Sequence, residues 1–598
     1  MVKEKGVVRK YKNDISVFIL ILVISLISVI RVGELPGLYL DAVNPDYLAV
    51  QVLNPSAYSS SWALPNLGIP LLGQVYHGTV TMFGSILSIL VTGTTSILQL
   101  RIVNGIYGTV ACYLVLRILI KLNIKKWIAI GVALALAISP NLTSMYRTQY
   151  YIELPGVIFM LLATICLISW TEETSQKKKI LNTGIFAGLA FYNYFNFIFF
   201  LPGMLIVLYA MLKYFKINER YRYLVVLLSG YAMGCYLYIL GYLMVCIVPL
   251  EVFTLEQKQM ICGVFTILWY SVLVFLYSLQ CKKNSQLKKT CAIIIFGCCT
   301  LVIIGLSTLN ELSGYMTGLN VAGSKGGLLE RVELIINYLL QILCYSCEEY
   351  IVLMKNVCVG LSWIPIFMAG LLIFMVYLRK KQKIEFDRRI KFVAGLVFTA
   401  FVYILLCLIM ATRMQGQHFV PMLFIMYLLI GVCIDIIYVY AYSTKSKNSL
   451  NMIVTIIFGI MIFGGALNQT KIYYELKNDD DNINMCYSDA IRLISEKALS
   501  EAYSETKQYY IFPEWGYMCG FGYLTGNTIP FSDHFGVYVK DLYEQGYSVI
   551  VCFWDEDNIS EYENTLISIL GDQIETEYIT DACWGEDAKI LKVEGFLK

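Results

Sequence analysis

The sequence is dominated by apolar runs that are each about as long as a lipid bilayer is thick. The first, Ile15 to Ile30, follows a segment with five Lys or Arg among its first twelve residues. An α-helix needs about 20 largely apolar residues to cross a hydrocarbon core of about 30 Å. Of the 598 residues, 58% are hydrophobic and 15% are charged, and the mean hydropathy is +0.64. Such a composition is far from that of a soluble globular chain, so an α-helical polytopic membrane protein is predicted.

The apolar runs predict about 13 transmembrane helices. No small-residue cleavage site is evident after the first run, which is therefore interpreted as a retained helix and not as a signal peptide. The stretch from His77 to Thr92 is only weakly apolar and is predicted to be an interfacial helix. The predicted spans are Ile15–Ile30, Leu100–Ile120, Ile128–Ser139, Leu154–Trp170, Ile180–Asn193, Phe195–Leu212, Leu224–Val245, Ile261–Leu279, Cys291–Leu309, Val357–Leu378, Phe392–Ala411, Phe419–Tyr440 and Met452–Leu467.

Clusters of Lys and Arg separate these runs and fall on alternate loops. Cytoplasmic loops of membrane proteins are enriched in these residues. We therefore expect a multi-pass protein of the cell membrane with a cytoplasmic amino terminus, a first outer loop at about 32–98 and an extracytoplasmic carboxyl-terminal tail. The net charge of +3 is spread over these clusters and forms no single patch, so nucleic acid is not an expected partner.

From residue 468 the sequence changes character. A helical period over 487–502 is followed by strand-like runs at 508–512 and 548–554, a helix-like run at 559–570 and a closing strand at 589–593. This order predicts a small extramembrane α/β domain at 468–598, after a transmembrane domain at 1–467. The predicted α/β domain has no Gly-rich phosphate loop, so a role in packing or in guiding the acceptor is expected for it.

The charged residues of the predicted outer face form three pairs along the chain. A reaction on a lipid-linked substrate at this face needs a carboxylate to take a proton from an attacking hydroxyl. It also needs cations or other donors to hold a phosphate leaving group. The candidates for these tasks are Asp41 and Asp46, Arg147 and Glu153, and Arg413 and His418.

These residues carry a resemblance to the GT-C glycosyltransferases, in particular to the protein O-mannosyltransferases and the lipid A aminoarabinose transferases. The resemblance covers roughly residues 10–440. Its elements are an acidic first outer loop, Arg101 on the second span, a Pro140 to Glu153 turn, and the late segment from Arg413 to Pro421. It implies a GT-C-like fold and transfer of a sugar from a polyprenyl-phosphate donor, with inversion, at the outer face. The expected partners are this donor, membrane lipids and a lipid, glycan or protein acceptor.

The sequence departs from the family pattern in two places. Asp41 matches the first acidic residue, but Ala42 stands where a Glu is common, and the second acid is Asp46. Either carboxylate therefore remains a candidate for the catalytic base. In the late segment His418 takes the place of an arginine expected near the donor, so Arg413 is the alternative contact for the phosphate.

Each candidate also has a structural interpretation. Asp46 could cap a helix, because it follows a proline and precedes an amphipathic run. Arg147 could pair with Glu153 within a loop. Arg413 and His418 could be interfacial anchors that reach the lipid headgroups.

The resulting prediction is a membrane glycosyltransferase, with Asp41 and Asp46 as catalytic candidates and Arg147, Glu153, Arg413 and His418 as substrate-binding candidates. Alternative functions are a lipid-linked oligosaccharide polymerase or ligase, and a flippase or transporter for lipid-linked sugars. No cofactor is assigned with certainty, although the carboxylate pair could hold a divalent metal ion.

Overall fold

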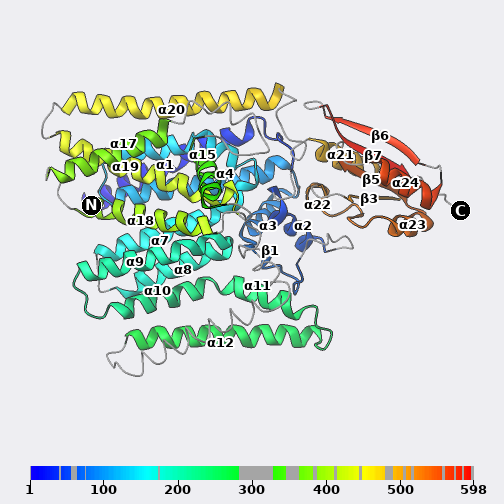
Figure 1. Cartoon of the computed structure of the whole chain (residues 1–598), viewed down its shortest axis with the longest axis horizontal. Helices are drawn as coiled ribbons and strands as arrows, with labels where there is room; N and C mark the ends of the chain where they lie inside the picture. Colours follow the sequence, from blue (N-terminus) through cyan, green and yellow to red (C-terminus); the bar gives the residue numbers. More distant parts are fainter. Residues whose placement is uncertain are drawn as a thin grey trace.

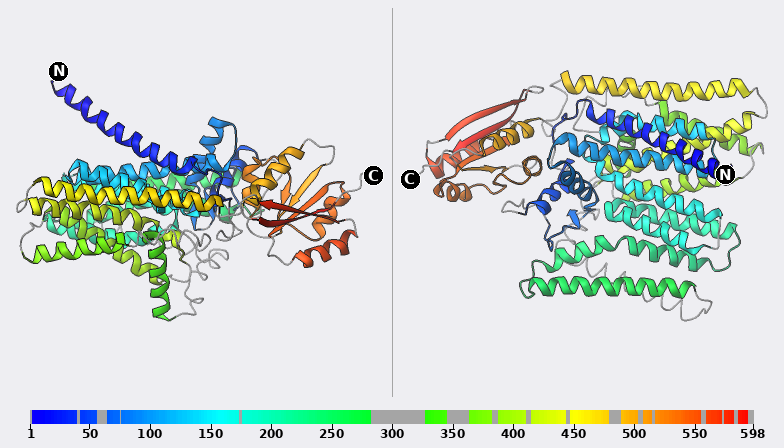
Figure 2. Two further views of the ribbon diagram at one scale, coloured as in Figure 1. Left: turned by 90° about the horizontal axis from the view of Figure 1, so that it is seen from above. Right: turned by 180° about the vertical axis from the view of Figure 1, so that it is seen from behind.

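A computed structural model of the chain gives a long helical bundle with a mixed β-sheet at one end (Figure 1). The amino terminus and the sheet lie at opposite ends of the bundle in every view (Figures 1 and 2). The structure describes residues 2–38, 42–55, 64–74, 76–172, 176–281, 327–344, 363–381, 387–409, 414–442, 447–478, 489–502, 507–513, 517–554, 559–571, 574–581 and 585–593.

The predicted apolar runs coincide with helices of the bundle, apart from Cys291–Leu309, which lies outside the described residues. Among the described residues, seven helices are long and apolar enough to cross a membrane, and the pair α10 and α11, bent by 47°, makes a candidate eighth. A mostly helical membrane fold is therefore confirmed, whereas the count of about 13 stays a prediction. The bundle helices are α1 Val2–Ile30, α4 Ile97–Lys121, α5 Lys126–Ala137, α7 Leu154–Glu172, α8 Lys177–Asn193, α9 Phe200–Tyr214, α10 Arg220–Gly234, α11 Tyr236–Ile247, α12 Leu255–Cys281, α17 Trp363–Lys380, α18 Arg388–Ile409, α19 Val420–Tyr442 and α20 Lys447–Asn478.

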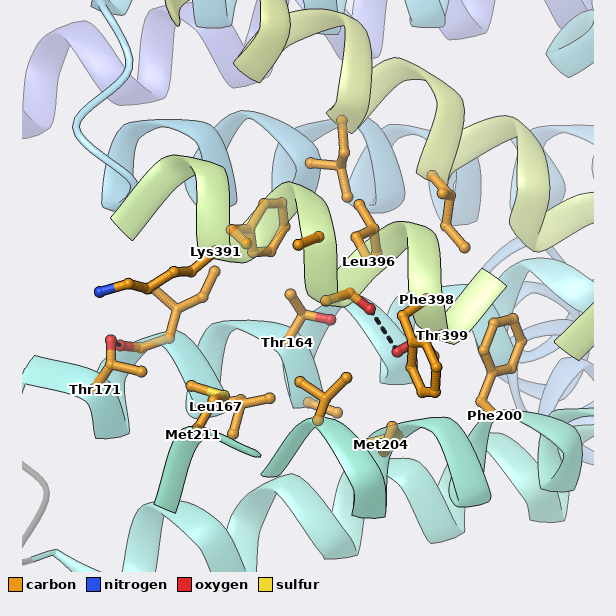
Figure 3. Close-up of a pocket in the computed structure, with 18 of the residues that line it drawn as sticks. Thr164, Leu167, Thr171, Phe200, Met204, Met211, Lys391, Leu396, Phe398 and Thr399 are labelled. Atoms are coloured by element: carbon orange, nitrogen blue, oxygen red, sulfur yellow. Dashed lines mark hydrogen bonds between the residues drawn. The ribbon is translucent and has the colours of Figure 1, made fainter. Parts of the chain in front are cut away.

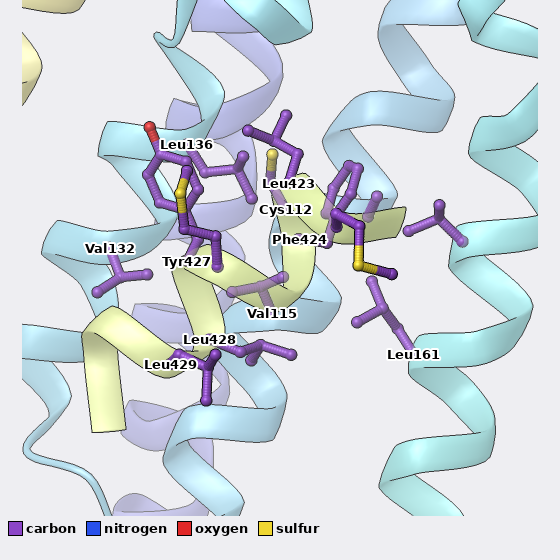
Figure 4. Close-up of a cluster of buried hydrophobic side chains, with 14 of the residues drawn as sticks. Cys112, Val115, Val132, Leu136, Leu161, Leu423, Phe424, Tyr427, Leu428 and Leu429 are labelled. Carbon is purple, nitrogen blue, oxygen red and sulfur yellow. The ribbon is translucent and has the colours of Figure 1, made fainter. Parts of the chain in front are cut away.

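Helix α19 lies at the centre of the bundle. Its side chains pack with those of α4, α5 and α7 in one buried apolar cluster, part of which is drawn in Figure 4. Leu423 and Tyr427 of α19, for example, are buried together with Cys112 of α4 and Val132 of α5. Close packing of this kind fixes the start of α19, and with it the short 3-10 helix η7 (Gly416–Phe419) that precedes it.

Glycines allow α8 and α10 to approach until their backbones touch. A Cβ added at Gly184 or Gly188 would lie 2.1 or 2.2 Å from a carbonyl oxygen of α10, and Gly230 and Gly234 meet α8 in the same way. The spacing of four residues on both helices is the small-residue pattern that lets membrane helices pack closely. Backbone contact at these glycines therefore adds to the packing of apolar side chains between the two helices.

The first predicted outer loop contains two short helices and a small hairpin. They are α2 (Asn44–Leu53), β1 (Leu72–Gln74), β2 (His77–Gly78) and α3 (Val80–Thr92). The 13 residues of α3 extend for about 20 Å at 1.5 Å per residue, which is too short for a bilayer core. The predicted helix is thus present, and its place in the membrane interface stays a prediction. Helix α15 (Leu328–Cys344) lies outside all the predicted spans and runs across their direction (Figures 1 and 2).

The carboxyl-terminal part is built on a five-stranded mixed sheet of order β4-β3-β5-β7-β6. β3 pairs in parallel with β4 and β5, whereas β7 pairs antiparallel with β5 and β6. The predicted division at residue 467 falls inside α20, which continues to Asn478, and this division stays a prediction. The elements are α21 Ala490–Glu501, β3 Gln508–Ile511, α22 Met518–Leu524, β4 Phe531–Ser532, α23 Val537–Glu544, β5 Ser548–Trp554, α24 Ile559–Leu570, β6 Ile574–Asp581 and β7 Gly585–Val593.

The sheet region shares a buried cluster with the first loop. Tyr47 and Val50 of α2 pack with Ile491 of α21 and Phe521 of α22. Asn54, at the end of α2, donates to the carbonyl oxygens of residues 526 and 527 at 3.3 and 3.1 Å. The first loop is therefore packed between the bundle and the sheet.

The contact between α8 and α10 gives the first testable prediction. Gly188→Ala should destabilise the protein by about 1–3 kcal/mol, the usual range for overpacking, because the new methyl group would meet the carbonyl oxygen of Tyr231 at 2.2 Å. Gly459→Ala on α20, where nothing lies within 4 Å, is the matched control. Thermal unfolding in detergent measures both variants, and equal melting temperatures would contradict the backbone contact.

Candidate functional site

The predicted site residues gather at the end of the bundle that faces the sheet. Asp46 lies on α2, Glu153 on the 3-10 helix η2 (Gln149–Glu153) and His418 on η7, and Arg147 lies in the turn before η2. A third 3-10 helix, η3 (Phe195–Phe199), adds Asn196 to the site. Asp41 and Arg413 lie outside the described residues. The other four candidates, Asp46, Arg147, Glu153 and His418, have defined surroundings.

Asp46 is fully buried in the first turn of α2. One carboxylate oxygen accepts a hydrogen bond from the Ser85 hydroxyl on α3, and the other accepts one from the Tyr151 hydroxyl on η2. The residue at the N-cap of α2 is Val43, and it makes no side-chain cap. The interpretation of Asp46 as the helix cap is therefore wrong, because its carboxylate instead joins three elements that are distant in the sequence.

Burial changes the acidity of Asp46. It raises the pKa of this carboxyl to about 6, since the charged form loses its hydration, and the hydrogen bonds from Ser85 and Tyr151 offset only part of the rise. No salt bridge to Asp46 is found in the described part of the chain. With both oxygens occupied by hydroxyl groups, Asp46 is suited to hold the loop in place.

Glu153 and Tyr151 lie on different faces of η2. Residues three apart in a 3-10 helix share a face, so Tyr150 and Glu153 point toward η7 while Tyr151 points toward α2. The hydroxyl of Tyr150 indeed lies beside Gly416 of η7. One short helix thus supplies both the partner of Asp46 and the second buried acid.

The Glu153 side chain is linked to His418 through Asn196 of η3. The Asn196 amide donates to Glu153 Oε1 at 2.9 Å and to the carbonyl oxygen of His418 at 3.1 Å, and the Tyr403 hydroxyl donates to the same carbonyl at 2.5 Å. Glu153 Oε2 is buried and has no hydrogen-bond partner among the described residues. This oxygen is available to accept a hydrogen bond from a ligand hydroxyl or to carry a proton.

Arg147 is buried against the end of α1. Its two terminal amino groups donate to the carbonyl oxygens of residues 28, 29, 31, 32 and 35. A helix leaves its last carbonyls without partners, and a cation there satisfies them and complements the helix dipole. Arg101 serves the same segment by donating to the carbonyls of residues 33, 35 and 36.

These contacts favour a structural role for Arg147 over the predicted contact with a substrate. The pairing of Arg147 with Glu153 that the sequence suggested is wrong, because Arg147 is bound to α1 and Glu153 to Asn196. Burial lowers the pKa of Arg147 to about 10, so it stays protonated at neutral pH. The two arginines fix the chain just before Leu38, where the acidic loop begins.

His418 is partly buried at the third position of η7. Its Nδ1 accepts a hydrogen bond from the backbone N–H of Gln415 at 2.9 Å, and its ring meets the edge of Tyr194 at a centroid distance of 5.2 Å. The side chain therefore completes the turn that leads into α19. Its predicted role in substrate binding stays a prediction, as does that of Arg413.

Within the described ranges, no group of three His, Cys, Asp or Glu side chains could hold a metal ion. Asp41 lies outside those ranges, so a metal ion between Asp41 and Asp46 stays a prediction. Sequence analysis did not identify Ser85, Tyr151, Asn196 or Tyr403 as site residues. Hydroxyl and amide side chains are common, and these four lie in unrelated segments of the chain. Tyr151 and Asn196 do stand close in sequence to Glu153 and to the apolar run that starts at Phe195.

Asp46→Asn should remove a pH dependence of stability. The pKa of Asp46 is raised on folding, so the folded state holds this proton more tightly than the unfolded state. The wild type should therefore gain stability relative to the variant as pH falls from about 6 to about 4, and lose it again as pH rises. The shift from 3.8 to about 6 corresponds to about 3 kcal/mol.

Thermal unfolding of both proteins at pH 8 and pH 4.5 measures this difference. Asp541→Asn, at an exposed carboxylate on α23, controls for the loss of one negative charge. A difference between wild type and Asp46→Asn that is constant with pH would contradict a buried carboxyl with a raised pKa.

Known proteins resemble the chain in two ways. Residues 80–239 match the family model described as dolichyl-phosphate-mannose-protein mannosyltransferase, and this segment holds Ser85, Arg147, Tyr151, Glu153 and Asn196. None of the curated protein sequences matches the chain.

Solved structures of similar outline have low sequence identity to the chain. The archaeal oligosaccharyltransferase AglB from Archaeoglobus fulgidus, in complex with an inhibitory peptide and a dolichol-phosphate, is 12% identical, with 95% of this chain and 70% of that chain covered and a TM-score of 0.49. ArnT from Cupriavidus metallidurans, bound to undecaprenyl phosphate, is 11% identical, with 96% and 97% covered and a TM-score of 0.49. The S. cerevisiae Pmt1-Pmt2 complex is 14% identical, with 38% and 33% covered and a TM-score of 0.27.

The match to the family model supports the predicted resemblance to the GT-C glycosyltransferases. It lies in the region that carries the second to sixth predicted spans and the buried acid Glu153. The chain is therefore similar to the GT-C type membrane glycosyltransferases, through its match to the protein mannosyltransferase family over residues 80–239.

Proposed function

We propose that the chain is a membrane glycosyltransferase that transfers a sugar from a polyprenyl-phosphate donor to an acceptor, with inversion, at the outer face of the cell membrane. The observation that carries the proposal is the contact of Asp46 with Ser85 and Tyr151. It ties the acidic first loop to the segment that matches the mannosyltransferase family. The description of that family supports a lipid-phosphate sugar as donor.

In this proposal Asp41 is the general base and Asp46 positions the loop. Asp46 is buried with both oxygens occupied, which leaves little access for an acceptor hydroxyl. Asp41 stands five positions before Asp46 in the sequence, and its neighbour Ala42 is buried in the bundle core. The loop is therefore anchored on the side of Asp46 and, through Arg101 and Arg147, on the side of α1.

Arg413 is proposed to contact the donor phosphate. It precedes η7, whose residue His418 is linked through Asn196 to Glu153. Glu153, with one carboxyl oxygen unpartnered within the described structure, is proposed to accept a hydrogen bond from a sugar hydroxyl. Because the amino terminus and the sheet lie at opposite ends of the bundle, a cytoplasmic amino terminus would put this site outside.

Asp41→Asn tests the assignment of the base. A positioned base contributes typically about 10² to 10⁴-fold, so turnover should fall by that factor while donor binding stays nearly unchanged, since the amide is almost isosteric. Release of polyprenyl phosphate from polyprenyl-phosphate mannose, in membranes that contain the acceptor, measures turnover. Asp541→Asn is the control. If Asp46→Asn abolishes turnover and Asp41→Asn does not, the two roles must be exchanged.

Arg413→Ala should weaken donor binding as well as turnover. A phosphate contact exists in both the ground state and the transition state, so its loss raises the dissociation constant of the donor. Arg413→Lys keeps the charge and should recover part of the affinity. Titration of purified protein with polyprenyl phosphate measures the effect, with Lys540→Ala at an exposed position as control. An unchanged affinity in Arg413→Ala would remove the arginine from the donor site.

A further inference from the structure

A cavity of about 700 Å³ lies between α7, α9, α18 and α19. Its walls are mostly apolar, with Leu167 of α7, Met204 of α9 and Leu396 of α18 among them (Figure 3). Two of its lining residues, Ala210 and Ala394, are exposed on the surface of the bundle. The cavity is therefore a groove that opens sideways, toward the place of the lipid chains.

The groove is long and narrow. Helix α7 lines it from Val157 to Thr171, a distance of about 20 Å at 1.5 Å per residue. At one end α9 and α18 close together, since a Cβ on Gly203 would lie 3.1 Å from Thr399. One leaflet of a bilayer core is about 15 Å thick, so the groove has room for a single extended hydrocarbon chain.

Basic side chains stand at the other end of the groove. Lys391, visible at one end of the cavity in Figure 3, and Arg388 both line it from the first turn of α18. Lys391 Nζ lies 3.6 Å from the centre of the Tyr214 ring. Phe200, at the opposite end in Figure 3, is apolar, so the two ends of the groove differ in charge.

The charges around this end leave a positive excess. Arg388 and Lys121 share the carboxylate of Glu172, at 3.3 and 3.1 Å, and Lys391 adds a third cation. Farther along the same end, Arg389 and Lys125 are balanced by Asp387 and Asp435. In these two groups of described residues, five cations face three carboxylates, a net charge of +2 in the positions where a lipid headgroup would lie.

We propose that this groove binds an anionic phospholipid of the leaflet on the Arg388 side. One acyl chain fills the groove, and the headgroup phosphate lies against Lys391 and Arg388. This lipid site is separate from the proposed site of sugar transfer. Arg388 is the first residue of α18, whereas Glu153, Asn196 and His418 lie near the other end of that helix. The donor phosphate has to reach that other end, so the basic end of the groove suits a resident lipid and not the donor.

The bound lipid would connect two parts of the bundle. Its chain would contact α7 and α9 on one wall and α18 and α19 on the other, and α19 is the central helix that leads from η7. A ligand that binds only the folded state stabilises it in proportion to the logarithm of its concentration. The lipid is therefore expected to act as a structural component.

The test uses the full chain, delipidated in detergent and supplied with phosphatidylglycerol or with phosphatidylcholine of the same acyl chains. Wild type should retain phosphatidylglycerol in native mass spectrometry and melt at a higher temperature with it than with phosphatidylcholine. Lys391→Gln with Arg388→Gln should weaken phosphatidylglycerol binding by about 10- to 30-fold, since each cation near a headgroup is worth about 1 kcal/mol. Lys391→Gln alone, which keeps the ion pair of Arg388, should show part of this loss.

Two further variants distinguish the contribution of the acyl chain to binding from that of the headgroup. Ala394→Trp should block the groove and reduce binding of both lipids, whereas Lys178→Gln, at an exposed lysine of α8, should change neither. Equal binding of the two lipids by wild type, or displacement of phosphatidylglycerol by an equimolar amount of polyprenyl phosphate, would overturn the proposal. These measurements do not depend on sugar transfer, so their outcome is independent of the proposed function.

Discussion

The buried carboxylate of Asp46 is the contact on which the arrangement of this end of the molecule depends. A charged or polar group inside a protein is costly unless its hydrogen bonds are satisfied. Ser85 and Tyr151 meet that demand from two other elements, so α2, α3 and η2 hold one another in place. The next residue of α2, Tyr47, packs against α22. One short helix thus sets the first loop against both the bundle and the sheet.

The buried arginines solve a related problem for the backbone. The last carbonyls of α1 have no partner within the helix and need donors. Arg101 and Arg147 provide these donors and draw the following segment against α4 and η2. Charge at this end of the bundle therefore has two uses. Arg101 and Arg147 satisfy backbone carbonyls, whereas Asp41 and Arg413 are the residues proposed to act in sugar transfer.

Sequence reasoning recovered the parts of the fold that are local. An apolar run of sufficient length forms a helix in a membrane because every backbone hydrogen bond is made within the segment, so α7, α18 and α19 appear where their composition placed them. It missed α15 and the contact of α8 with α10, although Gly184 and Gly188, four residues apart, are a signal for the latter. The suggested cap role of Asp46 and the suggested pairing of Arg147 with Glu153 are wrong, whereas the roles of Asp46 and Glu153 in the site stay predictions.

The sequence by itself determined that this chain is a helical membrane protein and that its acids and bases gather between particular spans, because hydropathy and charge act residue by residue. The tertiary structure alone decided which of them are buried and what they bind. Asp46 meets partners 39 and 105 residues away, and Asn196 joins Glu153 to a residue on a helix turn more than 200 positions later. Such contacts depend on how the helices pack, and no local pattern encodes the distance between them.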